Sequence, residues 1–342
     1  MVWPLKLERQ EVQPGFFDHE DRLELLEKLG DPLPILERLV DWETFRPELV
    51  GLRKESDPHK GGRPPFDVVL MFKVLVLQHF YNLSDEQTEF QIRDRYSFCR
   101  FLGLDPHDRV PDAKTIWLYR ERIKRADLME SLFDTLLVQI NGAGFTARQG
   151  QVVDAALVPA PKQRNNREEN AGIKEGKVPE DWSENKRRQK DVEARWTKKH
   201  GKSHYGYKNH ISVDRQHKII RRYSVTPASV HDSQEFEGLL DGQNSSRDIW
   251  ADSAYRSAEL EQKLKERGYR SHVHRKGSRK RSLNAREQEA NRKRSRVRAR
   301  VEHVFAQQQE RLIRTIGKER AGVKIGFMNL VYNMRRWASV VA

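Results

Sequence analysis

The chain has 342 residues, 33% of them charged, and a formal net charge of +14. This excess of positive charge indicates a polyanionic partner, either nucleic acid or a membrane surface. Neither a transmembrane helix nor a signal peptide is predicted, because Lys73 and Gln78 interrupt the longest apolar run and residues 1–10 lack an apolar core. The one cysteine, Cys99, excludes an internal disulfide and is typical of a reducing compartment. We therefore expect an intracellular, cytoplasmic protein that binds nucleic acid.

The first 141 residues are predicted to be helical. Residues 1–60 form a small N-terminal region, with apolar residues at helical spacing over 18–29 and 33–49. Residues 61–141 are predicted to form a second helical domain for DNA binding or dimerisation, with helices at 66–83, 84–102, 115–123 and 128–140. Ser84 and Gln87 have the spacing of a capping box. The pattern is similar to a helix-turn-helix module, although any helical bundle gives such spacing.

The pattern changes at residue 142, and we expect residues 142–342 to form an α/β domain. A strand is predicted at 151–158, followed by two hairpin strands at 204–214 and 217–226. A helix (233–240), a strand (247–252), a helix (257–267) and a strand (269–275) come next, and two helices at 285–313 and 325–338 complete the domain. A hairpin followed by strand–helix units predicts a mixed sheet flanked by helices, in an order that fits a ribonuclease-H-like fold. The polar segment 161–203 is predicted to be either a mobile, DNA-facing insertion or a disordered linker.

Three acidic residues lie where an acid is costly or unexpected. Asp154 interrupts the apolar strand VVDAALV, which suits either a cation site or the solvent face of an edge strand. Asp252 closes the strand RDIWAD, where it could bind a ligand or cap the following helix. Glu302 borders an apolar stripe on its helix and could simply pair with Arg298 one turn earlier. Acids on a first strand, a later strand and a final helix can converge, and clustered carboxylates bind Mg²⁺. Two such ions would clamp an in-line phosphoryl displacement.

Most of the positive charge lies just before Glu302. Residues 274–300 hold twelve Lys or Arg against two acids, a local balance of +10. A localisation signal or a solvated helix face gives the same pattern. Basic charge beside a metal site suits a polyanionic substrate. His272 and His274 share a strand face and could bind a transition metal, but we favour DNA contact or packing. No glycine-rich phosphate loop is found, so ATP use is not expected.

Several blocks in order resemble bacterial insertion-sequence transposases with a DDE triad, of the IS-five-like group. They are GRPPFDVVLMFKVLVLQHFYNLSDEQ, PDAKTIWLYRERI, VVDAALVPAP, HYGYKNHISVD, TPASVHDSQ, IWADSAYRS and RVRARVEHVFAQQ. The last block is also similar to the Y-x2-R-x3-E-x6-K signature of the IS-four-like group. There Ser295 stands at the tyrosine position and Gln309 at the lysine position, which would contact DNA near the cut.

The resemblance implies a DNA transposase whose metal-binding and catalytic triad is Asp154, Asp252 and Glu302. It implies two Mg²⁺ ions, for which Mn²⁺ can substitute, and a homodimer that binds the terminal inverted repeats and target DNA without ATP or a membrane. Metal-assisted water would cut one strand, and the 3′-OH would then attack target DNA. The residues that we expect to bind DNA are Arg298, Arg300, Arg296, Lys208, Arg294 and Lys293. Residues that can line the site are His231, Asp232 and His303.

Two other functions fit the same residues. One is a nuclease of this fold that hydrolyses DNA but never joins strands. The other is a DNA-binding protein derived from a transposase whose catalysis has weakened, for which Gln309 argues mildly and the intact triad argues against.

Overall fold

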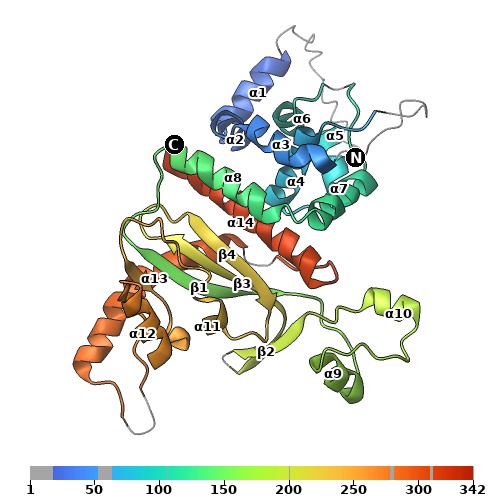
Figure 1. Cartoon of the computed structure of the whole chain (residues 1–342). Coiled ribbons are helices and arrows are strands. Elements are labelled where there is room, and N and C mark those ends of the chain that lie inside the picture. The colour runs from blue at the N-terminus through green and yellow to red at the C-terminus, as the bar shows by residue number, and fades with distance from the viewer. Residues whose placement is uncertain are drawn as a thin grey trace, which may run out of the picture.

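The structure is a computed structural model that describes residues 18–52, 64–105, 107–199, 201–277, 281–308 and 311–341. A helical bundle and a mixed sheet lie on opposite sides of the last helix, α14 (Lys318–Val341), which runs beside α8 (Met129–Gly142) (Figure 1). In the described part of the chain, no helix is both long and apolar enough to cross a bilayer.

The N-terminal part is helical, as predicted. Its elements are α1 (Asp18–Lys28), α2 (Leu33–Leu39), η1 (Trp42–Phe45), α3 (Arg46–Leu49), η2 (Val50–Leu52), α4 (Val68–Tyr81), α5 (Asp85–Asp94), α6 (Tyr96–Leu102), α7 (Ala113–Arg125) and α8 (Met129–Gly142). The predicted capping box is confirmed, since Ser84 and Gln87 each bond the other's backbone N–H at 3.1 and 3.0 Å. The predicted helices 33–49 and 84–102 are each broken, because Val40 and Arg95 have extended backbones.

The C-terminal part contains a six-stranded mixed sheet. Its strands are β1 (Gln151–Pro159), β2 (Arg195–Lys199), β3 (Lys202–Asp214), β4 (Ile220–Pro227), β5 (Asp248–Trp250) and β6 (Arg270–Ser271). They follow the order β2-β3-β1-β5-β6, with β4 also paired to β3. β1 is antiparallel to β3 and parallel to β5, and β5 is parallel to β6. The expected α/β, ribonuclease-H-like mixed sheet is confirmed.

Helices cover both faces of this sheet. Because side chains alternate along a strand, Val152 packs against residues of α13 (Ala285–Gln308) and α14, whereas Val153 faces the other layer. That second layer is formed by α11 (Asp232–Glu235), η3 (Ser253–Tyr255) and α12 (Ala258–Glu266). β1 is therefore central and covered on both sides.

The polar segment 161–203 contains two helices and a strand, so the prediction of a disordered linker is wrong, whereas its proposed position facing DNA stays a prediction. It contains α9 (Arg167–Lys174), α10 (Glu184–Gln189) and β2. Its small core is Trp182, which is 3% exposed and donates a hydrogen bond to Glu169 at 2.7 Å. Asn166 and Glu169 form a capping box at the start of α9, a sequence signal that could have revealed this helix.

Two other expectations need correction or stay open. The predicted strand 269–275 is only two residues long, although His272 and His274 still donate backbone hydrogen bonds to Ile249 and Ala251. The domain boundary at residue 60 lies outside the described residues. The boundary at residue 141 stays a prediction, since one apolar core joins α2–α8, α14 and part of the sheet.

Candidate active site

Asp154 lies on the central strand β1, so the edge-strand alternative is wrong. Its side chain is 15% exposed, and its Oδ1 accepts a hydrogen bond from the Ala155 N–H at 2.9 Å. Burial raises the pKa of this carboxyl above its ordinary value; Arg298 and the Ala155 N–H oppose the rise, and the charge of Asp252 adds to it. A carboxylate held in this way favours a nearby cation.

Asp252 follows β5, the neighbour of β1, and caps the turn η3, whereas Ser257 caps the helix α12; ligand binding by Asp252 stays a prediction. Its Oδ1 accepts from the Ser253 N–H at 2.5 Å and so caps η3. Its Oδ2 faces Arg298 at 3.9 Å. The side chain is 44% exposed, so it meets solvent while facing the buried Asp154.

Arg298 joins the two acids. Its Nη1 lies 2.9 Å from Asp154 Oδ2 and 3.9 Å from Asp252 Oδ2, while its Nε is buried without a partner among the described atoms. The arginine is therefore the cation that both carboxylates share in this structure. The proposed pairing of Arg298 with Glu302 does not form, because the guanidinium turns toward Asp154.

Glu302 lies one helical turn after Arg298 on α13, and its side chain is exposed. Val301 and Val304 beside it are buried, as the predicted apolar stripe requires. Within the described ranges, Glu302 has no ion pair, and no three acidic, histidine or cysteine side chains gather closely enough to hold a metal ion. The structure thus brings together Asp154 and Asp252 but does not bring Glu302 to them.

A buried tyrosine lies close to the acid pair and was missed in the sequence. Tyr255 is 1% exposed, packs on Phe236 with ring centroids 5.2 Å apart, and has a hydroxyl without a hydrogen-bond partner among the described atoms. Burial raises its pKa, and the charges of Asp154, Asp232 and Asp252 raise it further. The hydroxyl therefore keeps its proton. The sequence signal that could have indicated this tyrosine was its position three residues after Asp252.

A second polar group lies on the α11 side of the sheet. Lys208 of β3 donates to Asp232 at 2.7 Å and to the Val230 carbonyl at 2.6 Å. His231 caps α11 by accepting from the Ser233 N–H. Lys208 and Asp232 are thus each other's partners, whereas His231 serves the local backbone.

The remaining basic residues of α13 point in different directions. Arg294 donates to the Val273 carbonyl at 3.2 Å, and Arg300 donates to the Arg215 carbonyl at 2.7 Å. Lys293 and Arg296 are exposed and available to a ligand. His303 lies near Lys218, Arg336 and Tyr332 and is not brought to the acid pair. Gln309 lies outside the described residues.

The two histidines after β6 do not form a metal site together. His272 bonds Asp248 at 2.8 Å and stacks on Trp250, with ring centroids 4.7 Å apart. His274 Nδ1 lies 4.0 Å from Asp252 Oδ1. The first histidine packs, as favoured, and the second lies beside the acid pair.

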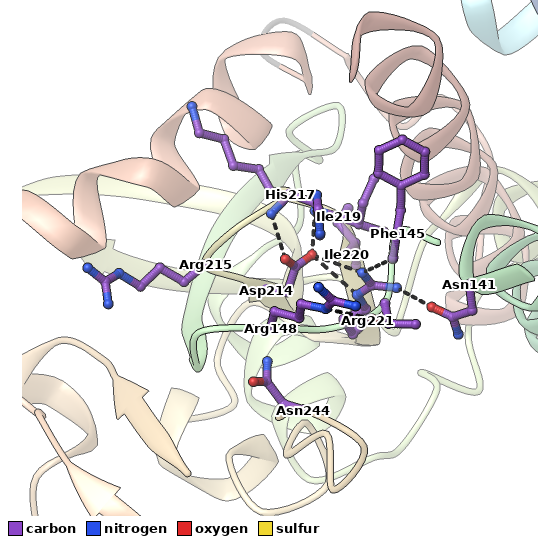
Figure 2. Close-up of polar contacts among 12 residues, drawn as sticks. Asn141, Phe145, Arg148, Asp214, Arg215, His217, Ile219, Ile220, Arg221 and Asn244 are labelled. Carbon is purple, nitrogen blue, oxygen red and sulfur yellow. Dashed lines mark hydrogen bonds and ion pairs between the residues drawn. The ribbon is translucent and has the colours of Figure 1, made fainter. Parts of the chain in front are cut away.

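A buried ion pair at the β3–β4 turn positions the sheet against α8 (Figure 2). Asp214 accepts from the N–H groups of His217 and Ile219 at 2.7 and 3.0 Å, and Arg221 reaches it at 3.2 Å. Arg221 also donates to Asn141 Oδ1 at 2.9 Å and thereby reaches the end of α8. These groups satisfy one another, so we assign them to the fold.

The donor set at the acid pair fits a hard divalent cation. Carboxylate oxygens are the ligands that Mg²⁺ and Ca²⁺ prefer, and Asp154 and Asp252 already share one cation. On a mixed sheet of this kind, such an acid pair is typical of metal-dependent enzymes of phosphoryl transfer on nucleic acid, and comparison with known families tests that class.

The chain belongs to the transposase DDE domain family, whose model matches residues 146–334. A second model, described as "Transposase domain (DUF772)", matches residues 20–122. The protein is therefore a DDE-type DNA transposase that depends on divalent metal, as the sequence predicted. It is also similar to a piggyBac transposase solved by cryo-EM as a synaptic complex with hairpin DNA, with a TM-score of 0.45 and 14% identity over 91% of this chain and 75% of that chain.

Proposed function

We propose that this transposase binds the inverted repeats at the ends of its insertion sequence and cuts and joins DNA through Asp154, Asp252 and Glu302. The observation that carries the proposal is the single guanidinium shared by Asp154 and Asp252, since two carboxylates from neighbouring strands meet at one cation position. Glu302, one turn from that guanidinium, would supply the third carboxylate. We also propose that the protein is a member of the IS-five-like group of these transposases.

Mg²⁺ is the proposed physiological metal, and Mn²⁺ is expected to substitute. When bound, the metal offsets the charge that spreads over the phosphate oxygens in the transition state. Asp154 and Asp252 would hold it, and the protonated Tyr255 beside them would keep a neutral donor near the reacting phosphate.

The chain's own cations have a separate part in the proposed reaction. Arg298 is the nearest cation to the acid pair and would move its guanidinium to the DNA phosphate when metal takes its place between the carboxylates. Arg296 and Lys293 are exposed on the same helix and would bind neighbouring phosphates. Water attacks phosphorus, the bond to the 3′ oxygen breaks, and that oxygen takes up a proton. The resulting 3′-OH then attacks a phosphodiester of the target DNA, the bond from that phosphorus to the target's own 3′ oxygen breaks, and the released oxygen takes up the proton of the attacking hydroxyl.

Two copies of the chain are expected in the DNA complex, because an element has two ends. The proposed reaction needs no ATP, since the attacked phosphodiester bonds supply the joining chemistry. An enzyme that acts on bacterial chromosomal DNA would work in the cytoplasm, bound to the nucleoid.

Substitution of Asp154 tests the proposal directly. Asp154→Asn should bind duplex DNA from the gene's flanks as the wild type does, yet fail to nick it in Mg²⁺. Asp248→Asn is the matched control, because Asp248 opens β5 and bonds His272 and Arg270. Nicking by Asp154→Asn at the wild-type rate would disprove the assignment. A target plasmid in the same reaction distinguishes a transposase, which yields joined product, from a nuclease or an inactive derivative.

A further inference from the structure

Positive side chains from three separate elements gather around the turn between β3 and β4. Lys218 belongs to the turn, Arg300 to α13 and Arg336 to α14. Figure 2 shows Arg215 of the same turn pointing away from the buried Asp214 network, and its guanidinium lies 5.1 Å from the centroid of the Trp250 ring. The fold thus separates this group, which we call the turn cluster, from the structural ion pair beneath it.

Backbone carbonyls of the turn hold these side chains in place. The Arg215 carbonyl accepts from Arg300 Nη1 at 2.7 Å, and the His217 carbonyl accepts from Arg336 Nε at 2.7 Å. The Lys218 carbonyl accepts from the Tyr332 hydroxyl at 2.8 Å. Because a guanidinium has five N–H donors, both arginines keep free donors after these bonds.

Carboxylates do not balance the turn cluster. Over the described ranges, none of Arg215, Lys218, Arg300 and Arg336 has an acid within ion-pair distance. Asp214, the acid at this turn, is fully buried and committed to Arg221. Cations placed side by side repel one another unless an anion lies between them.

The charges of the two arginines also act on the Lys218 ammonium group. Burial lowers the pKa of Lys218, and Arg336 and Arg300 lower it further. Since the bonded carbonyls of Arg215 and His217 belong to the same turn as Lys218, the Lys218, Arg300 and Arg336 side chains lie close enough to contact one anionic ligand.

We propose that the turn cluster is a second phosphate-binding surface, which holds the DNA backbone beside the cutting site. The inference rests on the proposed function, because the expected anion is the DNA on which the acid pair acts. The helix α13 serves both places: Arg298 faces the acids, while Arg300 reaches the turn. A continuous polyanion such as DNA can occupy both at once, whereas a small phosphate cannot.

The sheet gives the distance between the two places. Asp154 pairs with Ile211, and Gln151 pairs with Asp214, the last residue before the turn. Three residues of strand span about 10 Å, and the turn lies just beyond. Since B-DNA rises about 3.4 Å for each nucleotide of a strand, the phosphate at the turn cluster should lie roughly three to five nucleotides from the scissile phosphate.

The salt dependence of DNA binding tests the surface. We would measure fluorescence anisotropy of a labelled duplex from the gene's flanks, in Ca²⁺, between about 50 and 200 mM salt. Lys218→Gln and Arg336→Gln should each reduce the slope of log K against log salt by roughly one, because each lost phosphate contact removes about 0.9. Lys265→Gln, an exposed neutralisation on α12, is the matched control and should leave the slope unchanged.

Methylphosphonate substitution then locates the contact. Neutralising single phosphates should weaken wild-type binding at a position roughly three to five nucleotides from the nick. The Lys218→Gln/Arg336→Gln double variant should be insensitive at that position alone. Lys218→Gln alone guards against misfolding, since the Lys218 side chain makes no hydrogen bond or ion pair with another described residue.

The outcomes separate the two proposals. An unchanged salt slope in both variants, with normal DNA binding and nicking by the wild type, overturns the turn cluster and leaves the transposase function intact. A wild-type protein that binds but never nicks DNA contradicts the proposed function instead. The same methylphosphonate sensitivity in wild type and double variant would also overturn the surface.

Discussion

Replacing Arg298 by methionine should make the DNA-free protein bind divalent metal more tightly. The guanidinium lies between the carboxylates of Asp154 and Asp252, where the proposed metal would bind. A metal ion must therefore displace it or bind against its charge. Methionine keeps the aliphatic length of the side chain and removes only the charged end.

The distances set the size of this effect. A unit charge about 4 Å from a dication costs about 8 kcal/mol at an effective dielectric of about 20. Asp252 is 44% exposed, so water screens much of that repulsion. If about a quarter of the repulsion remains after screening, its removal improves the free energy of metal binding by about 2 kcal/mol, which is roughly a 30-fold lower Kd for the metal.

Calorimetric titration with Ca²⁺ is a suitable assay, because Ca²⁺ takes oxygen ligands and the experiment needs neither DNA nor cleavage. Arg296→Met is the control, because Arg296 is exposed two residues before Arg298 on α13 and its substitution removes the same charge from the helix. Arg298→Met should bind more tightly than Arg296→Met. Weaker binding by Arg298→Met in a protein of normal thermal stability would refute the reasoning, since it would mean that Arg298 positions the carboxylates for the metal.

Two further predictions concern the fold. Asp214→Ala leaves Arg221 buried and unpaired, so it should lower the free energy of unfolding in urea by about 3–5 kcal/mol. Asp214→Leu combined with Arg221→Met should lower it far less. A loss below about 1 kcal/mol in the single variant would contradict this prediction. Burial lowers the pKa of His79 to about 3, so the folded state excludes the proton that the unfolded chain takes up below 6.5. The contribution of His79 to the free energy of unfolding should be greatest above pH 6.5 and fall by up to about 1.4 kcal/mol for each pH unit below it. Urea unfolding midpoints across this pH range measure the change. His79→Phe should flatten the pH dependence, and an unchanged slope in that variant would argue against the prediction.

Local signals made the helical part predictable. The apolar run of α4 and the Ser84–Gln87 capping box depend on residues a few positions apart, and both were found as expected. The interruptions at Val40 and Arg95 were not visible, because helical spacing of apolar residues continues across them. Strand lengths were less predictable still: β6 ends where its pairing ends, and pairing is set by distant parts of the chain.

The candidate site was predictable in composition but not in contacts. Asp154 and Asp252 were singled out because acids in apolar strands are costly, and the sheet does bring them together. The partner of Arg298 was not evident, since Asp154 lies 144 positions away in sequence while Glu302 lies only four. Tyr255 escaped notice because a tyrosine in an apolar block ordinarily predicts packing.

Helix geometry explains why the alternating arginines before Glu302 do not form one DNA-binding stripe. At about 100° per residue, Arg294, Arg298 and Glu302 fall on one face of α13, and Arg296 and Arg300 on the other. The contacts agree, since Arg298 meets the acid pair and Arg300 meets the turn. Metal binding should therefore couple Arg298 to Glu302 but not Arg300 to Glu302.

A double-mutant cycle tests this division of the helix. The Ca²⁺ affinities of Arg298→Met and Glu302→Gln should combine non-additively, because both residues are proposed to act at one cation position. Arg300→Met and Glu302→Gln should combine additively within about 0.5 kcal/mol. Additivity in both cycles would separate Glu302 from the acid pair and leave Asp154 and Asp252 without their proposed third ligand. Coupling confined to the first cycle would instead tie Glu302 to the metal site while its carboxylate is still exposed in the DNA-free protein.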